Sequence, residues 1–186
     1  MTDKSTIIKK TKNWINSFII HHTICPFAKR EYELDTISYD LVNSEKLEDQ
    51  LQELIVACEQ LDSNKTIETS LLIFPKGLSD FDDYLDLLAL ANSLMHKQGY
   101  EGVYQLASFH PEYCFEGVDE NDASNYSNRS PYPMLHLIRE TSLEKALENY
   151  PNPESIPVRN VEYLRELGNE KIQTILKKAN ALGIKR

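Results

Sequence analysis

Apolar residues recur along this chain with two different periods, and these periods predict where helices and strands lie. Helical spacing appears in three segments within the first hundred residues: Ile7 to His22, a segment that Ser44 can cap, and one between Ser79 and Gly99. Alternating or short apolar runs with turn residues at their ends predict four strands, at residues 36–42, 69–74, 104–110 and 134–139. The chain is therefore expected to combine helices with one sheet.

Strands that alternate with helices indicate βαβ units, in which parallel strands are joined by right-handed crossovers. The connection over residues 111–133 lacks a helical pattern, so the fourth strand is expected to run antiparallel to the third. The prediction is an α/β (α+β) fold with a mixed four-stranded sheet, mostly parallel with one antiparallel strand, covered by helices. Residues 1–150 would form this single α/β domain, and residues 151–186 a helical extension packed on it.

The C-terminal extension contains residues that typically begin and end helices. Pro157 suits a first helical turn, whereas Gly168 and Gly183 are placed to end helices. Nothing in this portion suggests chemistry, so it is interpreted as a helical layer or arm.

Composition excludes several classes of function. The chain has 186 residues and a formal charge of −9, with scattered rather than clustered Lys and Arg, which argues against nucleic-acid binding. Its three cysteines are odd in number and form no CxxC pair, so we expect a reducing compartment and no disulfide framework. No apolar run suits a secretion signal or a membrane span, and a cytoplasmic location is expected.

The connection over residues 111–133 holds the densest group of reactive and hydrogen-bonding side chains. Long irregular connections inside compact domains are uncommon and are usually functional or disordered, so we interpret this loop as covering the site. It leaves one strand and enters the next at the same edge of the sheet. We therefore expect His110 and His136, one on each strand, to lie close together beneath the loop.

Two histidines near a carboxylate fit more than one chemistry. With Asp122, or alternatively Glu112 or Asp119, they could bind Zn(II), Fe(II) or Mn(II) and support metal-dependent hydrolysis or oxidation. Without a metal they could act as an acid/base pair. The competing interpretation is that each histidine is a hydrogen-bonded core residue that holds the loop in place. No HxH or HExxH spacing decides between these readings.

Arg129 is the candidate for binding the substrate. Its guanidinium could hold a carboxylate or phosphate in bidentate fashion, which would make the partner a small anionic molecule. Equally, Arg129 could pair with Asp119 or Asp122 and only stiffen the loop. Tyr132 could serve either as part of a lid over a substrate or as a contact surface.

Cys25 offers a second enzyme hypothesis. It follows a predicted helix end and precedes Pro26, so it could be a thiol nucleophile with a histidine as base, or simply a buried residue. The ten residues from Phe27 to Thr36 could span about 33 Å when extended, so whether Cys25 reaches the histidines stays open. A third hypothesis is a non-enzymatic binding module whose tyrosine-rich loop grips a ligand or a protein.

Four sequence words occur in order along the chain: CPFA, LLIFP, YQLASFHPEYCFEG and NYSNRSPYPMLHLIRE. In this order and spacing they resemble an uncharacterised bacterial family, catalogued as domain of unknown function 1415, over nearly all of the chain up to Leu147. The resemblance implies a bacterial cytoplasmic protein but no particular activity. These words include seven candidate residues: Cys25, His110, Asn125, Asn128, Arg129, His136 and Arg139. Of these, Asn125, Asn128 and Arg139 are expected to bind the substrate.

Overall fold

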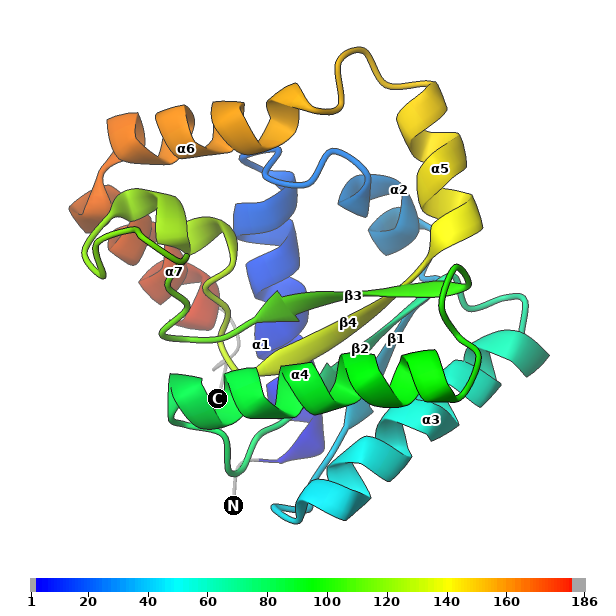
Figure 1. Ribbon diagram of the computed structural model, residues 1–186. Helices are drawn as coiled ribbons and strands as arrows, with labels where there is room; N and C mark the ends of the chain where they lie inside the picture. Colours follow the sequence, from blue (N-terminus) through cyan, green and yellow to red (C-terminus); the bar gives the residue numbers. More distant parts are fainter. Residues whose placement is uncertain (1–2, 182–186) are drawn as a thin grey trace.

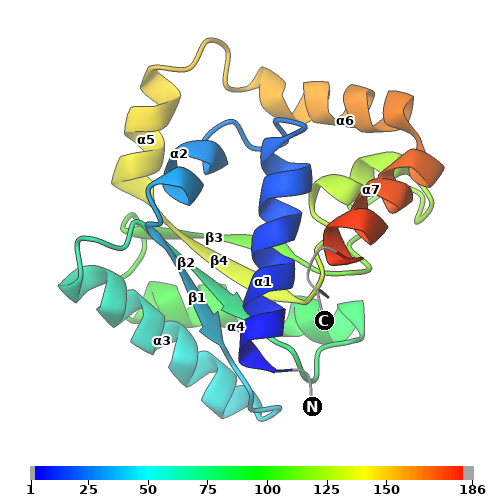
Figure 2. The ribbon, with the colours of Figure 1, turned by 180° about the vertical axis from the view of Figure 1, so that it is seen from behind.

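The computed structural model describes residues 3–181 and places a four-stranded sheet between two layers of helices (Figures 1 and 2). The strands, in chain order, are β1 (Ile37–Leu41), β2 (Thr69–Ile73), β3 (Tyr104–Phe109) and β4 (Met134–Arg139). In space the order is β1-β2-β4-β3. β1 and β2 are parallel, whereas β4 is antiparallel to both of its neighbours.

The four strands and the mixed sheet agree with the prediction, but the mostly parallel arrangement was wrong. β4 inserts between β2 and β3, so two of the three strand pairings are antiparallel. The apolar pattern of β4 explains this position, because Leu135 and Leu137 enter one core and Met134 enters the other. A strand that is apolar on both faces is best placed inside a sheet. β3 is left at the edge, where Gln105 is exposed.

One face of the sheet is covered by two long helices. These are α3 (Leu47–Ser63) and α4 (Phe81–Lys97), which lie on the near side of the sheet in Figure 1. Leu54 and Leu61 of α3, with Tyr84 of α4, pack in one core with Leu135 and Leu137 of β4. Asp80 rather than Ser79 caps α4, and Gly99 follows its end with φ +80° as expected of a helix terminator.

The other face is covered by the remaining helices, as seen from behind in Figure 2. They begin with α1 (Lys4–Trp14), which continues as a π-helical segment, η1 (Ile15–Ile20), in place of the single regular helix predicted. The others are α2 (Ala28–Glu33), α5 (Glu140–Glu148), α6 (Ser155–Leu167) and α7 (Asn169–Ala181). Trp14, Phe18, Leu164 and Ile172 form a second core with Leu71 of β2.

Both C-terminal helices share this second core with α1. Gly168, at φ +77°, ends α6 as predicted, whereas Gly183 lies outside the described residues. Two short elements were not predicted, α2 and a 3-10 helix, η2 (Ala123–Ser127), inside the 111–133 loop. None of the helices in residues 3–181 is long and apolar enough to cross a bilayer.

Candidate functional site

His110 and His136 lie on opposite faces of the sheet, so the expected meeting of the two imidazoles does not occur. His136 is paired with Ala107 of β3, and its ring centroid is 6.2 Å from that of Phe109 on the same face. His110 follows Phe109 directly and therefore turns to the other face. There its ring lies 5.1 Å from Phe81 and 5.2 Å from Tyr84, both of α4.

His110 is a fully buried residue that holds the start of the loop. Its Nδ1 accepts the backbone N–H of Glu112 at 3.0 Å, so the ring proton is on Nε2, which donates to the Leu78 carbonyl at 2.9 Å. Both ring nitrogens are thus engaged by backbone groups. No lone pair of His110 is left for a metal ion or for proton transfer, which supports its interpretation as a core residue.

The two asparagines of the loop fold it rather than face a cavity. Asn125 is fully buried, and its side chain donates to the Asp119 carbonyl and accepts the Phe115 N–H. The Nδ2 of Asn128 donates to the Ser108 carbonyl at 3.0 Å. Its own carbonyl accepts the N–H of His110. These bonds replace regular secondary structure over the loop, which accounts for a long connection that is nevertheless ordered.

Asp122 has a structural role at the start of η2. Its carboxylate accepts the Ser124 N–H at 2.9 Å and forms a two-pronged ion pair with Arg165 of α6, with N–O distances of 2.9–3.1 Å. The Arg165 guanidinium and the Ser124 N–H hold the pKa of Asp122 well below its usual range. Within residues 3–181, no group of three or more His, Cys, Asp or Glu side chains could hold a metal ion, which leaves the His110, His136 and Asp122 metal site without support.

The two candidate arginines differ in their surroundings. Arg139 donates to the carbonyls of Leu61 and Ile67, so it ties the end of α3 to the segment before β2. Arg129 donates to the Tyr113 carbonyl at 3.0 Å and to the Glu120 carbonyl at 2.7 Å. Neither predicted acidic partner of Arg129 lies within ion-pair distance of it, so the stiffening of the loop comes from backbone contacts instead.

Tyr132 contributes its backbone and its ring in different ways. Its carbonyl accepts the Ser130 hydroxyl at 2.6 Å, and its half-buried ring packs against the second core. Burial raises the pKa of its phenol. It belongs to the same face of the sheet as His136.

Of the two candidate histidines, His136 is the one that keeps a free ring nitrogen. Its Nε2 lies 2.6 Å from the Thr69 hydroxyl, which in turn donates to the Leu137 carbonyl. Because the hydroxyl proton goes to the carbonyl, the Thr69 oxygen accepts from His136, and the ring proton is on Nε2. The Nδ1 lone pair has no hydrogen-bond partner in the described part of the chain. Burial lowers the pKa of His136 to about 4, so the ring is neutral at neutral pH.

Cys25 lies in the turn between η1 and α2 and packs against the second core, which covers the same face of the sheet. The Ala28 N–H donates to the Cys25 carbonyl at 3.4 Å, which closes this turn. Burial raises the pKa of the Cys25 thiol, and the backbone N–H groups of Phe27 and Ala28 partly oppose that rise. The structure therefore brings Cys25 and His136 to one side of the sheet, apart from His110.

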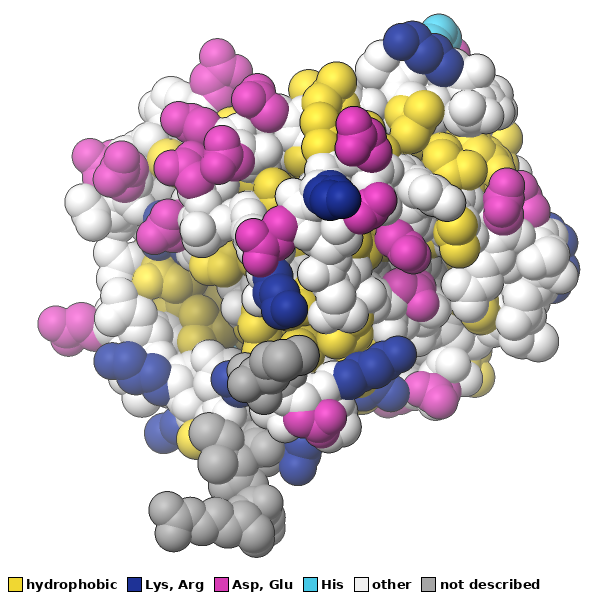
Figure 3. All heavy atoms as spheres, turned by 90° about the horizontal axis from the view of Figure 1, so that it is seen from below, with side chains coloured by type: hydrophobic (Ala, Val, Ile, Leu, Met, Phe, Trp, Pro, Cys, Tyr) yellow, Lys and Arg dark blue, Asp and Glu magenta, His cyan; other side chains and the backbone are white. Residues whose placement is uncertain are grey.

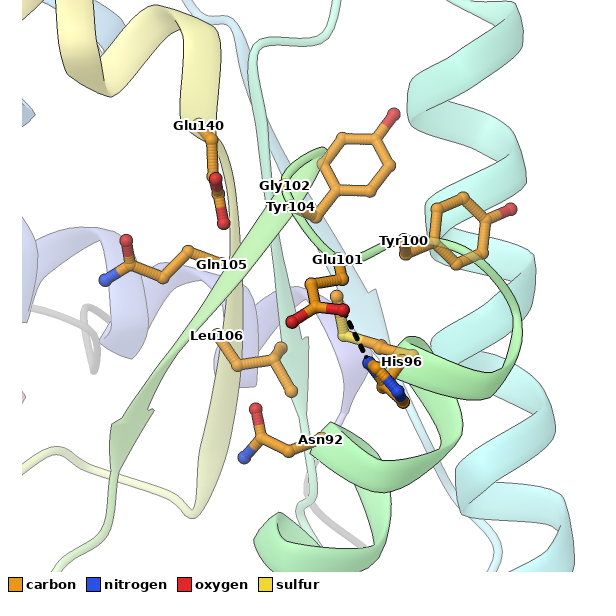
Figure 4. A pocket seen from close by; sticks show the side chains of 10 residues that line it. Asn92, His96, Tyr100, Glu101, Gly102, Tyr104, Gln105, Leu106 and Glu140 are labelled. Carbon is orange, nitrogen blue, oxygen red and sulfur yellow. Dashed lines mark ion pairs between the residues drawn. The ribbon is translucent and has the colours of Figure 1, made fainter.

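A cavity that was not predicted from the sequence lies between α4 and the edge strand β3 (Figure 4). It encloses about 270 Å³ and is lined by Asn92, His96, Glu101, Gln105 and Glu140, among others. His96 pairs with Glu101 at 2.6 Å, and both side chains are well exposed. In the sequence, the one notable feature of His96 is its place in the last turn of the helix that became α4. The rim is polar and open, without a buried reactive group.

A smaller cavity of about 90 Å³ lies beneath the 111–133 loop, between the loop, α1 and α7. Seen from below, the molecule shows apolar side chains in its hollows, with acidic and basic side chains interspersed around them (Figure 3). The described residues form no broad basic patch on this face.

Comparison with known proteins places the chain in a family. Residues 6–174 match the family described as Protein of unknown function (DUF1415). The chain belongs to the DUF1415 family. The match continues past Leu147, where the recognised sequence words end, through α6 and into α7. Neither the curated proteins nor the solved structures contain a match, so the site of this DUF1415 protein has to be interpreted from its own geometry.

Proposed function

We propose that this DUF1415 protein is a small-molecule enzyme in which Cys25 is the nucleophile and His136 is its general base. The observation that carries the proposal is the fixed proton position on His136, which leaves Nδ1 as an unengaged base. Cys25 packs over the same face of the sheet. A thiol and a histidine base form the simplest pair that can carry out nucleophilic catalysis without a metal.

The chemistry would proceed by proton transfer during attack. His136 Nδ1 takes the thiol proton while the Cys25 sulfur forms a bond to an electrophilic carbon of the substrate. The bond to the leaving group then breaks, and the leaving group takes the proton back from Nδ1. Water, activated by the same nitrogen, would release the product and restore the thiol.

The pKa shifts imply that the Cys25 thiol and the His136 imidazole are both uncharged in the resting protein. Burial raises the pKa of Cys25 and lowers that of His136, so at neutral pH the thiol is protonated and the imidazole is uncharged. The N–H groups of Phe27 and Ala28 would stabilise the thiolate as it forms. Such a thiol is protected from oxidation until a substrate arrives.

Aromatic side chains around this region favour an apolar substrate. The ring of Phe27, two residues from Cys25, meets that of Tyr150 at a centroid distance of 5.5 Å. Phe109 lies beside His136 and contacts Trp14 at 5.4 Å. These rings offer apolar surface near each member of the proposed pair, which suits a small acyl compound with an apolar body.

The test uses the three free cysteines as probes within one protein. Labelling by iodoacetamide and acetylation by p-nitrophenyl acetate are followed at each cysteine by peptide mass spectrometry. Cys58, whose pKa burial raises to about 12, should label most slowly. We expect His136→Gln to slow modification of Cys25 by about tenfold or more while Cys114 keeps its rate. A Cys25 that stays unmodified in the folded protein, or that reacts equally fast in both proteins, would refute the proposal.

A further inference from the structure

In the part of the chain that the structure describes, the cavity beneath the 111–133 loop is lined by a positive side chain and by no negative one, although the chain as a whole is acidic. Of the described residues that line it, Arg129 is the only charged one. Its other walls are mainly apolar and include Pro111, Pro131 and Leu176. A volume of about 90 Å³ is roughly that of three water molecules in the liquid, so only a ligand of a few heavy atoms would fit.

The positive charge of Arg129 is not neutralised by the protein. Its Nε and Nη2 donate to two backbone carbonyls, which are uncharged. Among residues 3–181, no carboxylate lies within ion-pair distance of the guanidinium. The Cζ atom of Arg129 lies over the Tyr126 ring, 4.9 Å from its centroid, and both residues line the cavity. The Nη1 amino group has no hydrogen-bond partner in the described residues, so it remains available to an anion.

A second donor, the Trp14 indole N–H, is buried in the wall of the same cavity. The Trp14 side chain is only 3% exposed, and its ring forms part of the cavity wall. Its Nε1–H is buried yet has no hydrogen-bond acceptor in the part of the chain that the structure describes. Buried indole N–H groups normally have an acceptor. The unpaired guanidinium and this unmet donor belong to residues of the same cavity wall, and both favour a ligand that accepts hydrogen bonds.

We infer that this cavity is a binding site for a small carboxylate with a short apolar body, such as a short-chain fatty acid. Arg129 Nη1 and Trp14 Nε1 would donate to the carboxylate, and the prolines and Leu176 would contact the alkyl group. The small volume and the apolar walls favour a carboxylate over phosphate, which has no apolar part. This site is separate from Cys25 and His136, and the inference does not depend on the proposed function.

The chain provides its own probe, because Trp14 is its only tryptophan. Propionate is titrated into the labelled protein at constant ionic strength, and the single indole N–H resonance is followed by ¹⁵N NMR. We expect a saturable shift with propionate, none with the neutral isostere propionamide, and a weaker response to inorganic phosphate. An unchanged indole resonance up to about 100 mM propionate, a limit set by millimolar affinity, would overturn the inference. So would an equal response to propionamide or a stronger one to phosphate.

Variants at Asn180 test the charge requirement without disturbing the loop. Asn180 is exposed and lies at the cavity wall. Asn180→Asp would place a like charge near the ligand and should weaken propionate binding about tenfold, whereas Asn180→Ala should change it less than about twofold. Equal affinities in the two variants would count against an anion site. Arg129→Gln should abolish binding, but it also removes loop contacts, so the Asn180 pair is the decisive comparison.

Discussion

The Thr69 hydroxyl lies 2.6 Å from Nε2 of His136 and determines which nitrogen of that ring carries the proton. Replacing Thr69 by Val keeps the shape but leaves the Nε2–H and the Leu137 carbonyl without this partner. We expect the free energy of unfolding to fall by about 1–3 kcal/mol. The ¹⁵N NMR spectrum of His136 should change from one tautomer to a mixture. The exposed Thr174→Val is the control and should change stability by less than about 0.5 kcal/mol; an unaltered tautomer in Thr69→Val would contradict the assignment.

Burial of His136 makes stability depend on pH in a defined window. The imidazole pKa is about 6.5 in an unfolded chain and is lowered to about 4 in the folded protein. Between these values the unfolded chain binds a proton that the folded chain does not, so the free energy of unfolding falls as the pH falls. The loss should be complete near pH 4 and reach at most about 3 kcal/mol.

Urea unfolding at pH 7 and at pH 4.5 measures this loss. His136→Gln, whose amide can still donate to Thr69, should lose less stability over the same interval. The pKa of His22 is also lowered by burial, but His22 is present in both proteins, so the difference between them isolates His136. Equal losses in the two proteins would show that His136 does not titrate in this way.

His110 should behave as a structural residue in spite of its place in the family's sequence words. Because both ring nitrogens bond to the backbone, His110→Asn should lower the free energy of unfolding by about 2–4 kcal/mol. In the fraction that remains folded, Cys25 should be alkylated at the wild-type rate. A selective loss of Cys25 reactivity in this variant, rather than in His136→Gln, would return His110 to the site.

The Tyr84 hydroxyl joins the main chains of β3 and β4. It accepts the Phe109 N–H at 3.0 Å and donates to the Met134 carbonyl at 2.7 Å, with the side chain fully buried. Tyr84→Phe should therefore cost about 2–3 kcal/mol of unfolding free energy, because two buried backbone groups lose a partner. Tyr113→Phe is the matched control, since its hydroxyl has one contact of 3.3 Å with Ser108. Similar costs for the two variants would argue against the bridge.

Asp122 combines a helix cap with an ion pair, and two substitutions separate them. Asp122→Asn keeps a capping oxygen but loses the charge opposite Arg165, so it should cost about 0.5–1 kcal/mol. Asp122→Ala loses both and should cost about 1 kcal/mol more. Chemical unfolding gives the values, and limited proteolysis should show faster cleavage within residues 111–133 for the Ala variant. The reverse order of costs would mean that the cap contributes little.

The strands were predictable because each is a short apolar run with clear ends. β4 was placed at Met134–Arg139 and β2 within one residue of its observed end. Strand alternation alone puts His110 on one face with Leu106, and His136 on one face with Ile138. Alternation could not predict the register between β3 and β4. A connection as long as residues 111–133 does not determine which residues of the two strands pair. The pairing of Ala107 with His136 decides the face, and it separates the two histidines.

The candidate site was predictable only in part, for a similar reason. Cys25 and His136 were named as candidates, but neither sequence nor spacing could show that they share a face. The roles of Asn125 and Arg139 were missed because their partners are backbone carbonyls, which leave no trace in residue identity. The cavity lined by Trp14 and Arg129 joins α1 to the loop across more than half of the chain, and only the packing of α7 closes it.

The central place of β4 has a consequence for biosynthesis. Until Arg139 has left the ribosome, β2 and β3 have no common neighbour, and they are separated by the width of a missing strand, about 10 Å. An incomplete chain would expose the edges of both strands to other molecules. The 111–133 segment must therefore be made before the sheet can close, and its Asn128 side chain ties it to the Ser108 carbonyl of β3, the strand that β4 must join.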